Sequence, residues 1–173
     1  MKVNDLKKHI RDVENFPQEG IIFKDISTLL KNKEAFKKSI DQLARKFKQS
    51  KIQYIVGVEA RGFIFGAALA YKLGAGFIPV RKKGKLPYKT KSVTYKLEYG
   101  TDTLEIHADA LPAKARVLVV DDLLATGGTV KAVTDLVKAQ GATIVGVAFL
   151  VELKFLNGKD RLKNYPLYSV IQY

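Results

Sequence analysis

Two neighbouring carboxylates and a turn of small residues stand after an apolar run in the second half of the chain. Residues 117–120 are Val-Leu-Val-Val, Asp121 and Asp122 come next, and Leu-Leu-Ala-Thr-Gly-Gly-Thr fills residues 123–129. The apolar run predicts a buried strand, and a helical pattern follows from about residue 128 to residue 140. Because ligands of open α/β folds bind beyond the carboxyl ends of the strands, we expect the two acids where that strand leaves the sheet, in a binding position.

This arrangement can hold a sugar phosphate. Carboxylates such as Asp121 and Asp122 accept hydrogen bonds from vicinal ribose hydroxyls. Backbone N–H groups at the start of a helix, together with the helix dipole, favour a phosphate, and glycine lets the backbone approach it closely. The residues expected to hold a ribose and its 5′-phosphate are Asp121, Asp122, Ala125, Thr126, Gly127, Gly128 and Thr129. The sequence contains neither a Walker A loop nor a G-x-G-x-x-G dinucleotide fingerprint.

A run of cations with no acid among them is a second chemical feature. It comprises Arg81, Lys82, Lys83, Lys85, Lys89 and Lys91. Like charges at this density repel one another, so we expect this segment to be mobile and to attract anions.

The elements that must position these residues alternate along the chain. Apolar patterns predict helices at 2–14, 33–48, 62–73 and 128–140, and strands at 54–58, 77–80, 117–120, 144–150 and 168–173. Short apolar strands that alternate with helices are typical of a parallel sheet covered on both faces. Residues 92–98 and 104–107 break this rhythm and predict an inserted β-hairpin, which would carry the basic run as a flap. The predicted fold class is therefore α/β, with a mostly parallel twisted sheet flanked by helices.

Composition is ordinary for a globular protein, except for its charge. The 173 residues are 47% hydrophobic and 27% charged, which fits one domain with one buried core. The chain has no cysteine, which excludes disulfides and cysteine nucleophiles and fits a cytoplasmic location. We see no secretory signal and no apolar run of about 18 residues, so no membrane partner is expected. The formal charge of +13 invites a polyanionic partner such as nucleic acid or a phosphate-rich small molecule.

The segment Val-Val-Asp-Asp-Leu-Leu-Ala-Thr-Gly-Gly-Thr (119–129) resembles the phosphoribosyl pyrophosphate (PRPP) motif of the type I phosphoribosyltransferases, in the form of their adenine-specific branch. Other segments resemble that family in the same order along the chain. They are the adenine-pocket hood at 15–26, the pyrophosphate loop at 57–66, the mobile catalytic loop at 81–87 with 95–100, and the end of the strand below the base at 150–153.

The resemblance implies one phosphoribosyltransferase domain over residues 1–173, with a hood and adenine-pocket segment at 1–30 and a mobile catalytic loop and hairpin at 81–107. It implies an enzyme that joins adenine to PRPP, giving AMP and pyrophosphate in purine salvage. Such an enzyme would use Mg²⁺, held mainly by substrate and water with no direct protein ligand assigned, and would form a homodimer. Lys24, where arginine is common, and Glu59-Ala60, where some members have Asp-Ser, are small departures.

Residue roles follow from the same resemblance. Pyrophosphate would be bound by Glu59, Ala60, Arg61, Gly62, Arg81, Lys82 and Lys85, with Arg81 reaching across a dimer interface. The resemblance also suggests a strained peptide bond between Glu59 and Ala60, with the cis form as one alternative. Adenine would be bound by the backbone of Ile22 and Lys24 and sandwiched between Phe23 and Leu153. Arg61 and Glu98 are the candidate catalytic residues, and Glu98 would handle a proton near N7 of the base.

Three other interpretations remain open from the sequence. An enzyme of the same class that acts on xanthine or hypoxanthine-guanine would share the PRPP motif, although the hood segment and Leu153 argue against it. A PRPP sensor or nucleic-acid regulator would explain the +13 charge, but no DNA-reading motif remains once the enzyme motifs are placed, so nucleic acid is not the expected partner. A structural or interaction protein would leave the acid pair and the glycine-rich turn unexplained.

Overall fold

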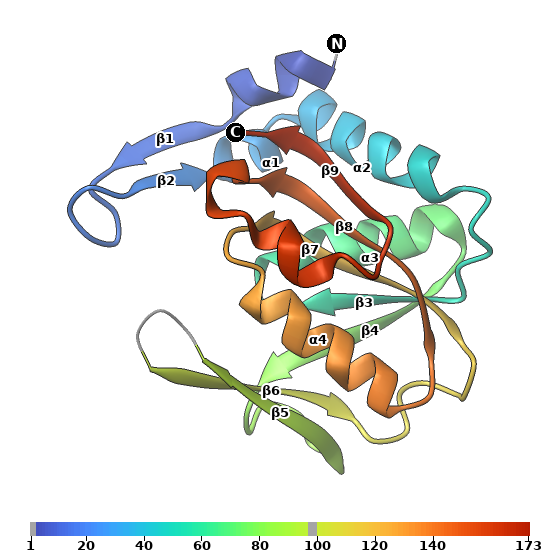
Figure 1. The fold of residues 1–173 in the computed structure, drawn as a ribbon. Helices are drawn as coiled ribbons and strands as arrows, with labels where there is room; N and C mark the ends of the chain where they lie inside the picture. The colour runs from blue at the N-terminus through green and yellow to red at the C-terminus, as the bar shows by residue number, and fades with distance from the viewer. Residues whose placement is uncertain (1–2, 97–99) are drawn as a thin grey trace.

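A seven-stranded sheet forms the centre of the molecule in a computed structural model that describes residues 3–96 and 100–173 (Figure 1). The strand order is β5-β6-β4-β3-β7-β8-β9. Strands β4, β3, β7, β8 and β9 pair in parallel with their neighbours, whereas β6 is antiparallel to both β4 and β5. This confirms the predicted α/β fold with a mostly parallel sheet and an antiparallel hairpin.

The elements in chain order are η1 (Val3–His9), β1 (Arg11–Glu14), β2 (Ile22–Asp25), α1 (Ser27–Lys31), α2 (Lys33–Phe47), β3 (Tyr54–Val58), α3 (Arg61–Leu73), β4 (Gly76–Lys82), β5 (Thr90–Lys96), β6 (Thr101–His107), β7 (Arg116–Leu124), α4 (Gly128–Ala139), β8 (Thr143–Glu152), η2 (Lys154–Leu156), η3 (Gly158–Leu162) and β9 (Leu167–Gln172).

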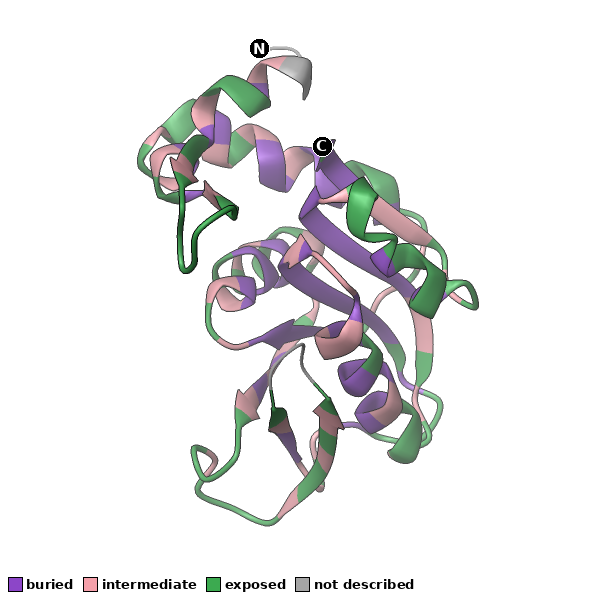
Figure 2. Ribbon diagram, turned by 60° about the vertical axis from the view of Figure 1, so that its left-hand side comes forward, coloured by how far each residue is buried: buried purple, intermediate pink, exposed green. Residues whose placement is uncertain are grey.

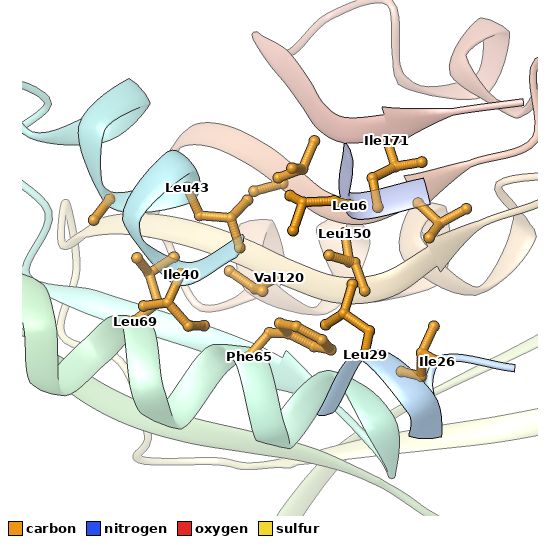
Figure 3. Close-up of a cluster of buried hydrophobic side chains, with 14 of the residues drawn as sticks. Leu6, Ile26, Leu29, Ile40, Leu43, Phe65, Leu69, Val120, Leu150 and Ile171 are labelled. Atoms are coloured by element: carbon orange, nitrogen blue, oxygen red, sulfur yellow. The ribbon is translucent and has the colours of Figure 1, made fainter. Parts of the chain in front are cut away.

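Two hydrophobic clusters cover the two faces of the sheet. Helices α1, α2 and α3 pack on one face, where Leu43, Phe65 and Leu150 are buried together (Figure 3). Helix α4 packs on the other face, where Val133 and Phe149 are fully buried. Strand β7 contributes side chains to both clusters, and Figure 2 shows that burial is concentrated in the central strands. The carboxyl end of β7 is thus anchored from both sides.

The three longer helices begin and end close to the predicted positions. Helix α2 is capped at its start by the side chain of Asn32, which accepts hydrogen bonds from the backbone N–H groups of Glu34 and Ala35. Strands β4 and β8 extend beyond their apolar runs, since backbone pairing continues through polar residues at their ends.

The predicted helix at 2–14 is wrong beyond His9. Residues 11–14 form β1, which pairs antiparallel with β2 as a separate two-stranded sheet. Two cross-strand ion pairs hold it: Arg11 Nη2 lies 2.5 Å from Asp25 Oδ2, and Lys24 Nζ lies 2.7 Å from Asp12 Oδ1. The apolar spacing of this short segment did not distinguish a helix from a strand, since the strand depends on pairing with β2.

The strand predicted at 117–120 is also longer than expected. Strand β7 continues to Leu124, paired with β8 through Asp121↔Phe149 and Leu124↔Glu152. Asp121 and Asp122 therefore lie within the last residues of the strand and not after it.

Among the helices that the structure describes, none has the length and apolar character needed to span a membrane.

Candidate functional site

The two acids at the end of β7 are buried next to a cation. Asp121 is 9% exposed and Asp122 is 5% exposed. The Asp122 backbone N–H donates to Asp121 Oδ1 at 2.8 Å, and Arg61 Nε lies 2.8 Å from Asp122 Oδ2. Although this ion pair is close, Asp122 Oδ2 has no aligned hydrogen-bond donor among the described residues. That buried oxygen therefore contacts the charge of Arg61 without an aligned hydrogen bond.

Burial also changes the protonation of these acids. Burial raises the pKa of Asp121 well above its usual range, and the negative charge of Asp122 raises it further. Burial likewise raises the pKa of Asp122, and the Arg61 guanidinium offsets part of this effect. Hydroxyl or cationic groups of a ligand would lower the free-energy cost of keeping two neighbouring carboxylates buried and charged.

Gly62 allows Arg61 to reach the acids. A Cβ on Gly62 would lie 2.7 Å from Asp121 Oδ1 and 3.2 Å from Asp121 Cα. Only glycine lets the start of α3 approach β7 this closely, which brings the neighbouring Arg61 to Asp122.

The turn between β7 and α4 presents backbone N–H groups. Gly127 adopts φ 81°, and no side chain described in the structure caps the helix that starts at Gly128. The turn rests on Gly158, because a Cβ on Gly127 would overlap the Gly158 carbonyl and a Cβ on Gly158 would overlap the Ala125 carbonyl. Sequence reasoning missed Gly158, although Asn157-Gly158 is a recognisable turn signal.

The end of the β5–β6 hairpin lies beside this turn. The Tyr95 hydroxyl is 3.4 Å from Thr129 Oγ1, and a Cβ on Gly128 would be 3.7 Å from the Lys96 carbonyl oxygen. Tyr95 is a second residue that sequence reasoning did not assign to the site. The candidate catalytic residue Glu98 lies outside the described residues.

The loop between β3 and α3 binds the first cations of the basic run. The Glu59–Ala60 peptide bond is cis, as expected. The Glu59 carboxylate accepts hydrogen bonds from Lys85 Nζ at 2.5 Å, the Lys82 backbone N–H at 3.0 Å and Arg81 Nη2 at 3.3 Å. Burial raises the pKa of Glu59, but these three donors outweigh it and lower that pKa to about 2.

The segment expected to bind a base reaches the same place. The Arg61 guanidinium lies over the Phe23 ring, 5.2 Å from its centroid, while its Nε contacts Asp122. Ile22 is 53% exposed. The structure thus brings the base segment, the β3–α3 loop and the acid pair together around Arg61.

Lys24 and Leu153 are the other two residues expected to bind the base. Lys24 directs its side chain to Asp12 and to the Tyr173 ring, so that side chain is already engaged. The Leu153 backbone N–H donates to the Leu124 carbonyl oxygen at 2.9 Å, which puts Leu153 beside the end of β7.

Comparisons with known proteins agree with this geometry. Residues 25–171 match the family described as "Phosphoribosyl transferase domain". The adenine phosphoribosyltransferase of Brachyspira hyodysenteriae is 56% identical over 169 residues, covering 98% of this chain and 99% of that protein. A crystal structure of adenine phosphoribosyltransferase from Thermoanaerobacter pseudethanolicus has a TM-score of 0.96 at 50% identity, over 99% of this chain and 100% of that one. The Saccharomyces cerevisiae enzyme, solved with adenine and an imino-altritol bisphosphate, has a TM-score of 0.91 at 44% identity, over 97% of each chain.

Proposed function

The chain belongs to the phosphoribosyltransferase family, and from this premise we infer that it is an enzyme which transfers the phosphoribosyl group of PRPP to adenine, giving AMP and pyrophosphate in purine salvage. The observation that carries this function is the convergence on Arg61, which contacts both the buried acid Asp122 and the aromatic residue Phe23. These contacts would hold a sugar site and a base site side by side. The reaction needs this arrangement, because N9 of adenine must attack C1′ of the ribose as pyrophosphate leaves from the opposite side.

The ribose and its 5′-phosphate would be held at the end of β7. Asp121 and Asp122 would accept hydrogen bonds from the ribose hydroxyls, which suits two buried carboxylates. The 5′-phosphate would occupy the turn from Ala125 to Thr129, where backbone N–H groups at the start of α4 and the threonine hydroxyls can donate to it.

Pyrophosphate would bind where the β3–α3 loop meets the basic run. Arg61 and the backbone N–H groups of residues 59–62 would offset the negative charge that grows on the leaving group, together with Arg81, Lys82 and Lys85. This charge stabilisation lowers the barrier because it is strongest in the transition state.

Mg²⁺ would arrive with PRPP. Among the described residues, no group of three or more His, Cys, Asp or Glu side chains could hold a metal ion. We propose that the ion would be held mainly by the substrate and water, with no direct protein ligand assigned. The ion would supply positive charge against the leaving group.

Adenine would lie against Phe23 and Leu153. Ile22 and Lys24 are two residues apart in β2, so their backbone groups point in the same direction, and they can offer a donor and an acceptor to N1 and N6. We propose that Glu98 handles the proton near N7 when the β5–β6 hairpin closes over the base.

A direct assay tests this function. The purified protein with adenine, PRPP and Mg²⁺ should form AMP and pyrophosphate, and omission of PRPP should abolish both products. Guanine, hypoxanthine and xanthine serve as matched substrates. Faster turnover of any of these three purines would overturn the assignment to adenine.

We further propose a cytoplasmic homodimer. The lack of cysteine fits a reducing compartment. The resemblance places Arg81 across the dimer interface, but Arg81 pairs with Glu59 of its own chain, so we propose that it serves the pyrophosphate site of that chain. Light scattering at micromolar concentration measures the oligomeric state, and a monomer would contradict the homodimer.

A further inference from the structure

The Glu59 side chain forms ion pairs with cations that, in the proposed function, bind pyrophosphate. It is 9% exposed and forms ion pairs with Arg81 and Lys85. Its carboxylate also accepts the Lys82 backbone N–H. An anion of this chain therefore stands against the same donors that a diphosphate would need.

We propose that Glu59 is a placeholder for pyrophosphate: it holds Arg81 and Lys85 in the free protein and releases them when pyrophosphate binds. This inference rests on the proposed function and assigns a positioning role to one residue of that site. In the free protein the placeholder keeps two long side chains of the basic run in one place, which reduces the entropy lost when they meet the ligand.

The same contacts also weaken the hold on pyrophosphate. When Arg81 and Lys85 move to the ligand, the Glu59 carboxylate loses its two cationic partners and lies near another anion. The lost ion pairs and the repulsion between the two anions cost free energy, which lowers the affinity for pyrophosphate. Release of the product is thereby favoured.

The other two cations proposed for pyrophosphate pair with acids other than Glu59. Lys82 Nζ pairs with Asp102 at 3.2 Å, and Arg61 Nε pairs with Asp122, so each cation has a different acid. Glu105 is the cross-strand partner of Arg81 and is 8% exposed, but its carboxylate accepts only the Gly84 backbone N–H among the described residues. It offers a matched control.

Glu59→Gln tests the proposal, because glutamine keeps an oxygen for the Lys82 N–H and removes the charge. Titration calorimetry with pyrophosphate and Mg²⁺ should give a dissociation constant about 5-fold lower than that of the unmodified protein. Glu105→Gln removes one charge from the same region and should change this constant by less than about 2-fold. Equal or weaker pyrophosphate binding by Glu59→Gln would overturn the proposal.

A second measurement needs no substitution. In the free protein, ¹³C NMR of the Glu59 carboxyl carbon should report a pKa of about 2. With pyrophosphate bound, the pKa should rise, since the cations of Arg81 and Lys85 have moved to the ligand and a second anion is near. A pKa that stays at about 2 would overturn the proposal.

The outcomes separate this inference from the proposed function. A protein that neither forms AMP nor binds pyrophosphate would contradict both. A protein that forms AMP, but in which Glu59→Gln does not bind pyrophosphate more tightly, would contradict the placeholder alone.

Discussion

At the scale of single residues, Asp122 is the group on which sugar binding depends most directly. It is buried, faces Arg61 and keeps one carboxylate oxygen free of an aligned donor in the described structure. Its shape is reproduced by asparagine, whereas its charge is not.

We therefore expect Asp122→Asn to lower kcat/KM for PRPP by about 10- to 100-fold, because a hydrogen bond to a charged group contributes about 1.5–3 kcal/mol. Steady-state kinetics with varied PRPP measures this. Asp135→Asn, which removes an exposed carboxylate paired with Lys131 on α4, is the matched control and should leave kcat/KM unchanged. Unchanged PRPP kinetics in Asp122→Asn would argue against the site.

We expect the charged form of Asp121 to lower the stability of the folded protein at neutral pH. Its pKa in the folded protein is raised by burial, so its contribution to stability is greatest below the unfolded value of 3.8 and is lost as pH rises through the folded pKa. Asp121→Asn should thus raise the melting temperature at pH 7 and have little effect below about pH 3.8. Thermal denaturation from pH 3 to pH 8 checks the sign of this difference.

Glu59 provides the opposite case. Its folded pKa of about 2 lies below the usual value of 4.5, so its stabilising contribution is present above pH 4.5 and is lost as pH falls through about 2. In the same pH series, Glu59→Gln should lower the melting temperature at pH 7 and converge with the unmodified protein near pH 2. The same sign for both variants at pH 7 would contradict these assignments.

At the scale of elements, the phosphate turn depends on its contact with the Asn157-Gly158 turn. Gly127 and Gly141 both have φ near 80°, but only Gly127 would place a Cβ against another backbone segment, whereas a Cβ on Gly141 would be no closer than 3.7 Å to Ala113. The two positions share backbone strain and differ in packing.

Gly141→Ala should therefore lower the free energy of unfolding by about 1 kcal/mol, because alanine is disfavoured in the left-handed backbone region. The KM for PRPP should be unchanged. Gly127→Ala should cost a further 1–3 kcal/mol, roughly, from the overlap and should raise the KM for PRPP. Urea denaturation and PRPP kinetics measure both quantities. If the two variants behave alike, the contact with Gly158 does not support the turn.

At the scale of the whole molecule, the sequence predicted the α/β architecture well, because its strands and helices carry clear apolar patterns with different periods. It also predicted the acid pair and the turn, which are contiguous in the chain. The contacts of Gly158, Tyr95 and Glu59 join segments that are distant in the chain. Local patterns at these residues, such as the Asn157-Gly158 turn signal, therefore did not identify their partners. The separate β1–β2 sheet was missed because it depends on pairing between two segments, whereas the apolar spacing of residues 2–14 alone fits a helix.

The two ends of the described chain meet at Tyr173. The ammonium groups of Lys7 and Lys24 lie 4.8 Å and 4.2 Å from the centroid of its ring. Tyr173→Ala should therefore raise the KM for adenine by about 5-fold and leave that for PRPP unchanged, since each exposed cation–π contact contributes about 0.5–1 kcal/mol. Tyr168→Ala, which removes a ring that packs on Phe47 and Lys46 of α2, is the control and should not affect adenine.

This meeting of the ends has a consequence for truncated forms of the protein. Leu6 packs in the same cluster as Ile171 (Figure 3), and the Lys24 ammonium lies over the Tyr173 ring. A chain cut before β9 keeps β7, α4 and the Asn157-Gly158 turn, but the segment proposed to bind adenine loses these contacts. Removal of β9 should therefore weaken adenine binding more than it weakens sugar-phosphate binding.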